Sequence, residues 1–186
     1  MSVKERVRLG GRSARIQAAV HQAVAALSTE IDRTELTVPL LAARAGVPPS
    51  TIYRRWGGLP ELLADVAVQR LRPLVDPLDT GTLRGDLESW TEQYMDEMSS
   101  PIGLAMIRDV LSASPDAVNA GQCSRYTAEQ LEVIAERARA RGEVTPAVDD
   151  MIDHIVAPIM YRILFGAPDG LDAAYCRALI ARALAG

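Results

Sequence analysis

The apolar residues of this chain recur at steps of three and four positions almost from end to end. This spacing places side chains on one face of an α-helix. It is clearest in residues 13–27, 87–98 and 146–166, and no stretch reads convincingly as a strand. Apolar residues make up 48% of the chain and aromatic residues only 4%, a composition that can bury a core and favours helices. We therefore predict an all-α protein of about nine helices.

Charge and turn residues divide the chain into two parts. Residues 1–72 carry a net charge of +5 and residues 73–186 a net charge of −9. A basic head on an acidic body is typical of a nucleic-acid-binding module attached to a domain with another role. We predict a DNA-binding domain over residues 1–59 and a second helical domain over residues 60–186. A helix over residues 60–72 connects the two, and a break rich in Pro, Asp and Gly follows it.

Residues 37–56 carry the sharpest functional signal. They contain two short helical stretches, Val38–Ala45 and Pro49–Trp56, which meet at Gly46. Two helices that meet at a steep angle need a small residue at their contact, here Ala42, and a turn residue that tolerates a positive φ, here Gly46. This is the pattern of a helix-turn-helix, whose second helix enters the major groove of DNA.

The second of these helices presents side chains suited to DNA. Ser50 or Thr51 can donate to a phosphate at its start, and Tyr53 can reach a phosphate. Arg54 and Arg55 can read guanine edges. The full set of predicted DNA contacts is Thr37, Arg44, Pro49, Ser50, Thr51, Tyr53, Arg54 and Arg55.

These motifs resemble the TetR family of bacterial regulators. The resemblance rests on Thr-x-x-x-Leu-Ala-x-x-Ala-Gly-Val at 37–47, Ser-Thr-Ile-Tyr-Arg-Arg-Trp at 50–56 and Pro-Glu-Leu-Leu at 60–63. Residues 141–146 and 158–166 are similar to the C-terminal domains of one TetR subgroup. Two positions depart from the pattern: Trp56 stands where the family usually has Phe, and Leu59 where it usually has Lys. The resemblance implies a helix-turn-helix domain followed by a helical domain for ligand binding and dimerisation.

The resemblance also implies a ligand-responsive repressor that binds a palindromic operator as a homodimer. Its C-terminal domain is expected to hold a small, mostly apolar effector in a cavity. A stripe of aromatic and methionine side chains at helical spacing is the candidate lining, namely Trp90, Tyr94, Met98, Met106 and Tyr126. The same stripe is also what an ordinary helical core would show.

The resemblance implies that the last two helices, residues 146–166 and 171–184, form the dimer interface, whereas their pattern alone would also allow both to pack within one subunit. The first is apolar over a broad face, so it must be covered on more than one side. The second carries a narrow stripe of small residues suited to close helix approach. The candidate contacts are Ile152, Ile155, Ile159, Ile163, Ala174, Tyr175 and Ala178.

Other classes of function find less support in the residues. No catalytic constellation is recognisable, so an enzyme is not expected, and the scattered Cys and His residues indicate neither a metal site nor a cofactor. With no apolar run of about 18 residues, no membrane partner is expected and the chain is predicted to be cytoplasmic. One alternative remains, a DNA-binding adaptor whose C-terminal half recognises a protein. An apolar cavity would favour the effector, and a filled core with a large exposed apolar patch would favour the adaptor.

Overall fold

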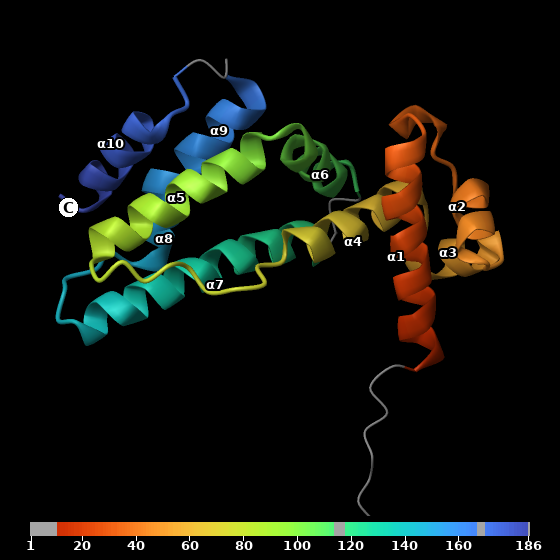
Figure 1. Ribbon diagram of the computed structural model, residues 1–186, viewed down its shortest axis with the longest axis horizontal. Helices are drawn as coiled ribbons and strands as arrows, with labels where there is room; N and C mark the ends of the chain where they lie inside the picture. Colours follow the sequence, from red (N-terminus) through yellow and green to blue (C-terminus); the bar gives the residue numbers. More distant parts are fainter. Residues whose placement is uncertain (1–10, 114–117, 167–169, 186) are drawn as a thin grey trace, which may run out of the picture. The chain divides into compact units, whose positions relative to one another are not determined.

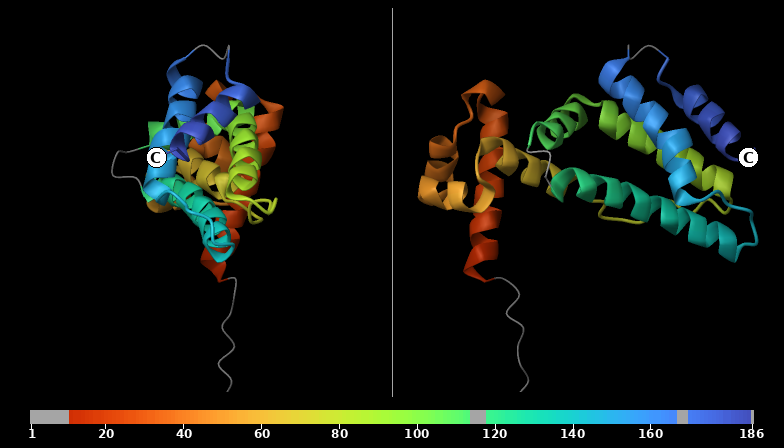
Figure 2. Two further views of the ribbon diagram at one scale, coloured as in Figure 1. Left: turned by 90° about the vertical axis from the view of Figure 1, so that its left-hand side faces the viewer. Right: turned by 180° about the vertical axis from the view of Figure 1, so that it is seen from behind.

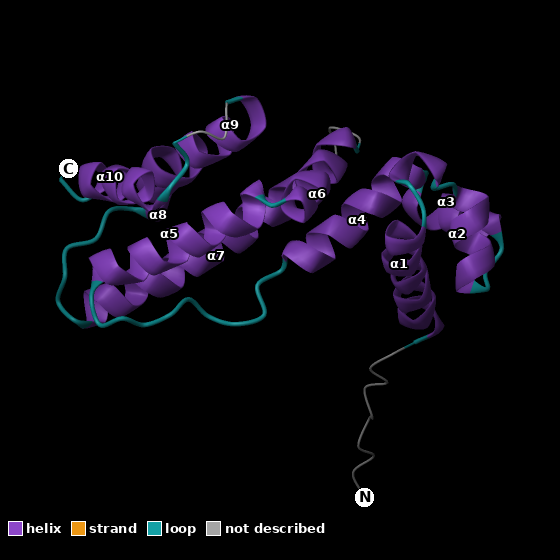
Figure 3. Ribbon diagram, turned by 45° about the horizontal axis from the view of Figure 1, so that its top comes forward, coloured by secondary structure: helices purple, strands orange, loops and turns teal. Residues whose placement is uncertain are grey.

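The structure, a computed structural model, describes residues 11–113, 118–166 and 170–185. Over these residues every regular element is helical, as predicted (Figure 3). The elements α8, a π-helical turn and α9 follow one another without a break. When these are counted as one helix and the short 3-10 turn at Arg33–Glu35 is left aside, the described part of the chain forms nine helices.

The chain forms two compact units. The N-terminal unit extends to Val66 and the C-terminal unit begins at Ala67, so the division falls within the helix α4 (Leu59–Leu71). Each unit has its own buried apolar cluster, as expected of parts that bury a core separately.

The N-terminal unit contains α1 (Arg12–Glu30), α2 (Val38–Ala45), α3 (Pro49–Trp56) and the first part of α4. In this unit α2 and α3 lie to one side of the long helix α1 (Figure 2). The bounds of α2 and α3 are those the sequence predicted. The fully buried side chains come from all four helices, namely Val20, Leu41, Ala42, Ile52, Leu62 and Ala64.

The C-terminal unit is a helical bundle around α5 (Leu83–Ser99), which lies between α7 (Val118–Ala140) and the pair α9 (Ala157–Phe165) and α10 (Ala173–Ala183) (Figure 1). The helix α6 (Pro101–Ser112) follows α5 after a sharp corner, and α8 (Val148–Met151) packs on α7. The core is apolar and includes Leu87, Leu131, Ile134, Met151, Ile155, Ile159 and Ile180.

Polar side chains fix the beginnings of several helices. Thr82 caps α5 by accepting from the Gly85 amide at 3.1 Å, and Ser100 caps α6 by accepting from the Gly103 amide at 2.9 Å. Such caps satisfy amides that a helix start leaves without a partner. Gly103 is also required by space, because a Cβ atom there would lie 2.1 Å from the carbonyl oxygen of Glu97. Ser100 and Gly103 therefore determine the turn from α5 into α6.

A π-helical turn (Ile152–Val156) connects α8 to α9. The sequence predicted one regular helix over residues 146–166, so this turn was missed. A π turn adds one residue to the helix, which rotates the following side chains by about 100° relative to an unbroken α-helix. The side chains of α9 therefore point in other directions than an unbroken α-helix over residues 146–166 would give them.

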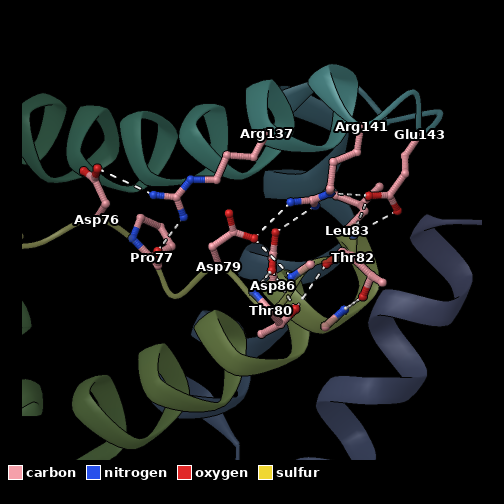
Figure 4. A network of polar contacts seen from close by, with 12 residues as sticks. Asp76, Pro77, Asp79, Thr80, Thr82, Leu83, Asp86, Arg137, Arg141 and Glu143 are labelled. Carbon is pink, nitrogen blue, oxygen red and sulfur yellow. Dashed lines mark hydrogen bonds and ion pairs between the residues drawn. The ribbon is translucent and has the colours of Figure 1, made fainter.

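The linker segment, residues 72–82, runs from α4 to α5 along α7 and is held there by two arginines of that helix (Figure 4). Arg137 Nη1 donates to the carbonyl of the buried Pro77 at 2.6 Å. Arg141 Nη1 donates to Asp79 Oδ1 at 3.0 Å, and its Nη2 donates to Asp86 Oδ2 at 2.9 Å. The linker segment is thus attached to the bundle without forming a helix or strand of its own.

Candidate nucleic-acid interface and effector cavity

The turn between α2 and α3 has the geometry that the sequence predicted. Thr37 caps α2 through its hydroxyl, which accepts from the Leu40 amide, and Gly46 ends the helix with a φ of 67°. The Val47 amide donates to the carbonyl of Ala42 at 3.0 Å and closes the turn. Glycine adopts this left-handed conformation without strain, and Ala42, the small residue expected at the helix contact, is fully buried.

All eight predicted DNA contacts lie on α2 and α3 or directly before α2. Seven are exposed, and Thr51 is half-buried. Tyr53 is 51% exposed, whereas Ile52 beside it is fully buried. One side of α3 therefore packs on the core and the opposite side faces solvent. Ser50 and Arg54 lie one turn apart, and Tyr53 is adjacent to Arg54 on α3. A face of this size and polarity fits the major groove.

Two of the predicted arginines are bound within the N-terminal unit. Arg44 forms an ion pair with Glu30 of α1, through one hydrogen bond of 2.9 Å and a second bond between the same side chains. Arg55 donates to Ser13 Oγ at 2.7 Å and to Gln17 Oε1 at 2.6 Å. For Arg54, in contrast, the structure records no ion pair or hydrogen bond with any described side chain. Of the two arginines of α3, Arg54 is thus the one that is exposed and not bound to another described side chain.

Ser13 lies in the first turn of α1, which begins at Arg12 after Gly11, and its hydroxyl accepts from Arg55. Gln17 and Asp65, which complete the polar contacts around α3, were not predicted. Neither is marked by a motif, because each acquires its partner only when α1, α3 and α4 pack together.

The five side chains proposed from the aromatic and methionine stripe all line one cavity of the C-terminal unit, with a volume of about 710 Å³. The structure therefore brings Trp90, Tyr94, Met98, Met106 and Tyr126 together. Trp90 and Tyr94 stack with ring centroids 5.1 Å apart and an interplanar angle of 20°. The remaining lining is contributed by further residues of α5, by the linker segment and by α4, α6, α7 and α9.

Most polar groups of the cavity are neutral, and the charged side chains of its lining are Arg70, Arg72, Asp76 and Glu97. Burial raises the pKa of Tyr94 to about 12, and a hydrogen bond with Thr127 offsets part of this rise, so the phenol stays protonated. The half-buried thiol of Cys123 also lines the cavity, and burial raises its pKa. Cys123 was not predicted, because a single cysteine outside any motif carries no sequence signal.

The linker segment forms one side of this cavity, which the sequence did not predict. Leu74, Val75 and Leu78 belong to the lining although their side chains are 92%, 77% and 64% exposed. The sequence did not predict this role, because these residues lie in a stretch rich in proline and aspartate, and a break between helices is expected to be polar.

Two of the predicted dimer contacts need correction. Ile155 and Ile159 are fully buried within the chain and have no surface to offer a second subunit. Ile152, Ile163 and Tyr175 are half-buried, and Ala174 and Ala178 are exposed. The error arose because the helix is apolar on more than one side and contains the π turn, so its periodicity did not identify the outward face.

The exposed apolar side chains of α9 are Tyr161 and Phe165. They are 67% and 75% exposed, lie one turn apart and contact each other with ring centroids 5.5 Å apart. None of the helices formed by the described residues is long and apolar enough to cross a membrane.

Comparison with known proteins bears on both units. Residues 77–183, more than half of the chain, match the family model described as "Tetracyclin repressor-like, C-terminal domain". The chain belongs to the TetR family of transcriptional regulators. Members of this family are DNA-binding transcriptional regulators and not enzymes.

Relatives in sequence and in structure agree with this assignment. The HTH-type transcriptional regulator AqdR of Rhodococcus erythropolis is 34% identical over 146 residues, which cover 76% of this chain and 70% of that protein. An uncharacterised HTH-type transcriptional regulator of Mycobacterium bovis is 27% identical over 132 residues, 68% of this chain and 65% of its own length.

Solved TetR regulators share the fold. One from a Rhodococcus species aligns with a TM-score of 0.62 at 14% identity, covering 94% of this chain and 98% of its own. One from Agrobacterium tumefaciens aligns with a TM-score of 0.60 at 18% identity, covering 91% and 92%.

Proposed function

We propose that this TetR-family regulator is an effector-responsive repressor that binds a palindromic operator as a homodimer. The observation that carries the proposal is that one chain combines an exposed helix-turn-helix with a cavity of about 710 Å³ in a separate unit. The first feature supplies DNA recognition and the second supplies a site at which a small molecule can bias the conformation.

Recognition of DNA is assigned to the outer face of α3. Arg54 would read a guanine edge, and Tyr53 and Ser50 would donate to phosphates, because these side chains are exposed and lie on adjacent positions of one short helix. Thr37, Pro49 and Thr51 lie at the starts of α2 and α3, where backbone amides also favour a phosphate.

The cavity favours an effector over a protein partner as the signal. A volume of about 710 Å³ lies within the range of small-molecule sites, and most of the side chains that line it are apolar, among them Trp90 and Met98. Such walls suit a small, mostly apolar molecule that forms one or two hydrogen bonds, for which the Tyr94 and Tyr126 hydroxyls are available. The alternative, an adaptor whose C-terminal half recognises a protein, predicts a filled core, whereas the C-terminal unit contains a cavity.

Dimerisation is assigned to the outward faces of α9 and α10. Tyr161 and Phe165 of α9 and the exposed Ala174 and Ala178 of α10 give an apolar surface with a stripe of small side chains. Two such helix pairs can form a four-helix interface about a two-fold axis. A dimer of this kind would hold two recognition helices about 34–36 Å apart, the spacing of successive major grooves on one side of B-DNA.

The test begins with the selection of duplexes from a random pool by the purified protein. We expect a palindromic sequence to be enriched, and we expect Arg54→Ala to weaken its binding by about 1–3 kcal/mol and to relax specificity at one position of each half-site. The matched control is Arg84→Ala, an exposed arginine on α5, which should leave affinity unchanged. Selection of no sequence by the wild-type protein would refute the DNA-binding role.

The effector is tested with a library of neutral, apolar compounds. A compound that occupies the cavity stabilises only the folded protein and should raise its Tm. The same compound should change affinity for the selected duplex. A compound that raises the Tm and leaves operator affinity unchanged at saturation would contradict an effector-responsive mechanism.

A further inference from the structure

One amide side chain connects three helices of the N-terminal unit. Gln17 of α1 accepts from Arg55 Nη2 of α3 through its Oε1 atom at 2.6 Å, and its Nε2 atom donates to Asp65 Oδ2 of α4 at 3.4 Å. Because the amide has one accepting and one donating end, it joins a cation to an anion that do not bond each other directly.

Asp65 is the centre of these contacts. Its Oδ2 atom accepts from Trp56 Nε1 at 2.7 Å and is paired with His21 Nε2 at 2.9 Å. Burial opposes the ionisation of Asp65, but the hydrogen bonds with His21 and Trp56 outweigh it and hold the pKa of this carboxyl below its usual value. The carboxylate therefore binds side chains from α1 and α3 at once.

The guanidinium of Arg55 is engaged on both of its terminal nitrogens. In addition to Gln17, it donates through Nη1 to the carbonyl oxygen of Ser13 at 3.0 Å and to its hydroxyl at 2.7 Å. It also lies over the Trp56 ring, 5.0 Å from the centroid. Three of its five N–H groups are thus used in contacts with α1. Bidentate reading of a guanine through both terminal nitrogens would compete with these contacts.

We propose that Arg55 is a positioning residue for DNA recognition, which sets α3 on α1 and α4 through Gln17 and Asp65 and leaves base reading to Arg54. The inference rests on the proposed DNA-binding function. The physical reason is the shortness of α3: a helix of eight residues is not stable alone, so its orientation depends on tertiary contacts. Apolar packing at Ile52 holds α3 against the core, and the directional bonds of Arg55 and Trp56 fix its rotation.

The test is a double-mutant cycle on the duplex that the wild-type protein selects, with the variants Arg55→Ala, Gln17→Leu and the double variant. Each single change should weaken binding about tenfold, the scale of one charge-assisted hydrogen bond. The double variant should bind no worse than Arg55→Ala, because Gln17→Leu removes a contact already lost. Additive losses, about a hundredfold in total, would overturn the proposal.

The salt dependence of binding separates positioning from a phosphate contact. Loss of a positioning residue leaves the slope of log K against log salt unchanged, whereas loss of a phosphate contact reduces its magnitude by about 1. An Arg55→Ala variant with a reduced slope, or with relaxed specificity at a single base pair, would show that Arg55 contacts DNA and would contradict our assignment.

Two controls keep the outcomes distinct. If Arg55→Ala does not fold, judged by its helical circular dichroism, the same cycle is run with Arg55→Lys, which keeps one donor for Gln17. The variant Arg54→Ala should show losses that multiply with those of Gln17→Leu. If wild-type binding and the Arg54→Ala loss are both seen and the Arg55 cycle is additive, only the positioning role fails. If the wild-type protein selects no duplex, the DNA-binding function and the positioning role both fail.

Discussion

Arg141 Nη2 lies 2.9 Å from Oδ2 of Asp86, a carboxylate that is completely buried at the start of α5. The other oxygen of Asp86 accepts from the amide and the hydroxyl of Thr80, each at 2.6 Å. The same guanidinium also binds Asp79 and, through Nε at 2.8 Å, Glu143 (Figure 4). One cation therefore serves three carboxylates, of which only Asp86 is fully shielded from water.

This difference in burial predicts unequal effects of two similar substitutions. Asp86→Asn replaces a carboxylate acceptor by an amide whose N–H group cannot accept from Thr80 or Arg141, and should lower the free energy of unfolding by about 1–3 kcal/mol. Asp79→Asn changes a carboxylate that is 54% exposed and should cost less than about 1 kcal/mol. Urea denaturation followed by circular dichroism measures both. Equal losses for the two variants would contradict the role we assign to burial.

The same carboxylate predicts how stability depends on pH. Burial of Asp86 opposes its ionisation, but the hydrogen bonds from Thr80 and Arg141 outweigh it, so its pKa lies below the usual value. A carboxyl with a lowered pKa in the folded state stabilises the protein above its unfolded pKa of about 4 and loses that contribution as pH falls through the folded pKa. The stability gap between wild type and Asp86→Asn should thus be full at pH 7 and shrink below pH 4. A gap that does not change with pH would contradict the assignment.

Occupation of the cavity by a protein side chain should block effector binding. Cys123→Trp places an indole in the lining, and it should abolish the rise in Tm with an effector while operator binding without effector stays near normal. The matched control is Ser124→Trp on the same helix, at an exposed position outside the lining, which should retain the response. Retention of the effector response by Cys123→Trp would place the effector elsewhere.

The outward face of α10 offers a test of the assembly. Ala178→Arg places a charge and a long side chain in the proposed stripe of small residues, so the dimer should dissociate and operator binding should be lost with it. Ala140→Arg, an equally exposed alanine at the end of α7, should change neither. Sedimentation at micromolar concentration gives the mass, and a native protein that sediments as a 20.1 kDa monomer would rule the dimer out.

The buried face of the preceding helix predicts a different result. Ile159→Ala removes a side chain that is fully enclosed within the chain, and should destabilise the C-terminal unit by about 2–5 kcal/mol. Denaturation of an obligate dimer depends on protein concentration, so the comparison is made at a single concentration. A variant as stable as the wild type would show that Ile159 is not part of the core.

The helix-turn-helix could be predicted from sequence because its determinants are local. Thr37, Ala42 and Gly46 act within one short segment through a cap, a close contact and a positive φ, and each role follows from residue type. The helix stripe that lines the cavity was also visible, because Trp90, Tyr94 and Met98 recur at helical spacing. Family resemblance supplied the functional class.

Other features could not be predicted because they depend on contacts between distant residues. Arg55 has the same appearance in a sequence whether it contacts DNA or α1, and only the position of Gln17 distinguishes the two. Ile155 and Ile159 are as apolar as an interface requires, yet the π turn and the packing of α9 against α5 direct them inward. Periodicity identifies an apolar helix, but it does not say which of its sides meets the core.

The two tryptophans of the chain fall one in each unit. Trp56 is held by Asp65 beside α3, and Trp90 is stacked on Tyr94 in the cavity wall. Each unit therefore carries a single tryptophan, in a distinct environment. With Trp90 replaced by Phe, the tryptophan emission reports on the helix-turn-helix unit alone. With Trp56 replaced by Phe, it reports on the cavity alone. Occupancy of the two sites can then be followed independently in solution, without any attached dye.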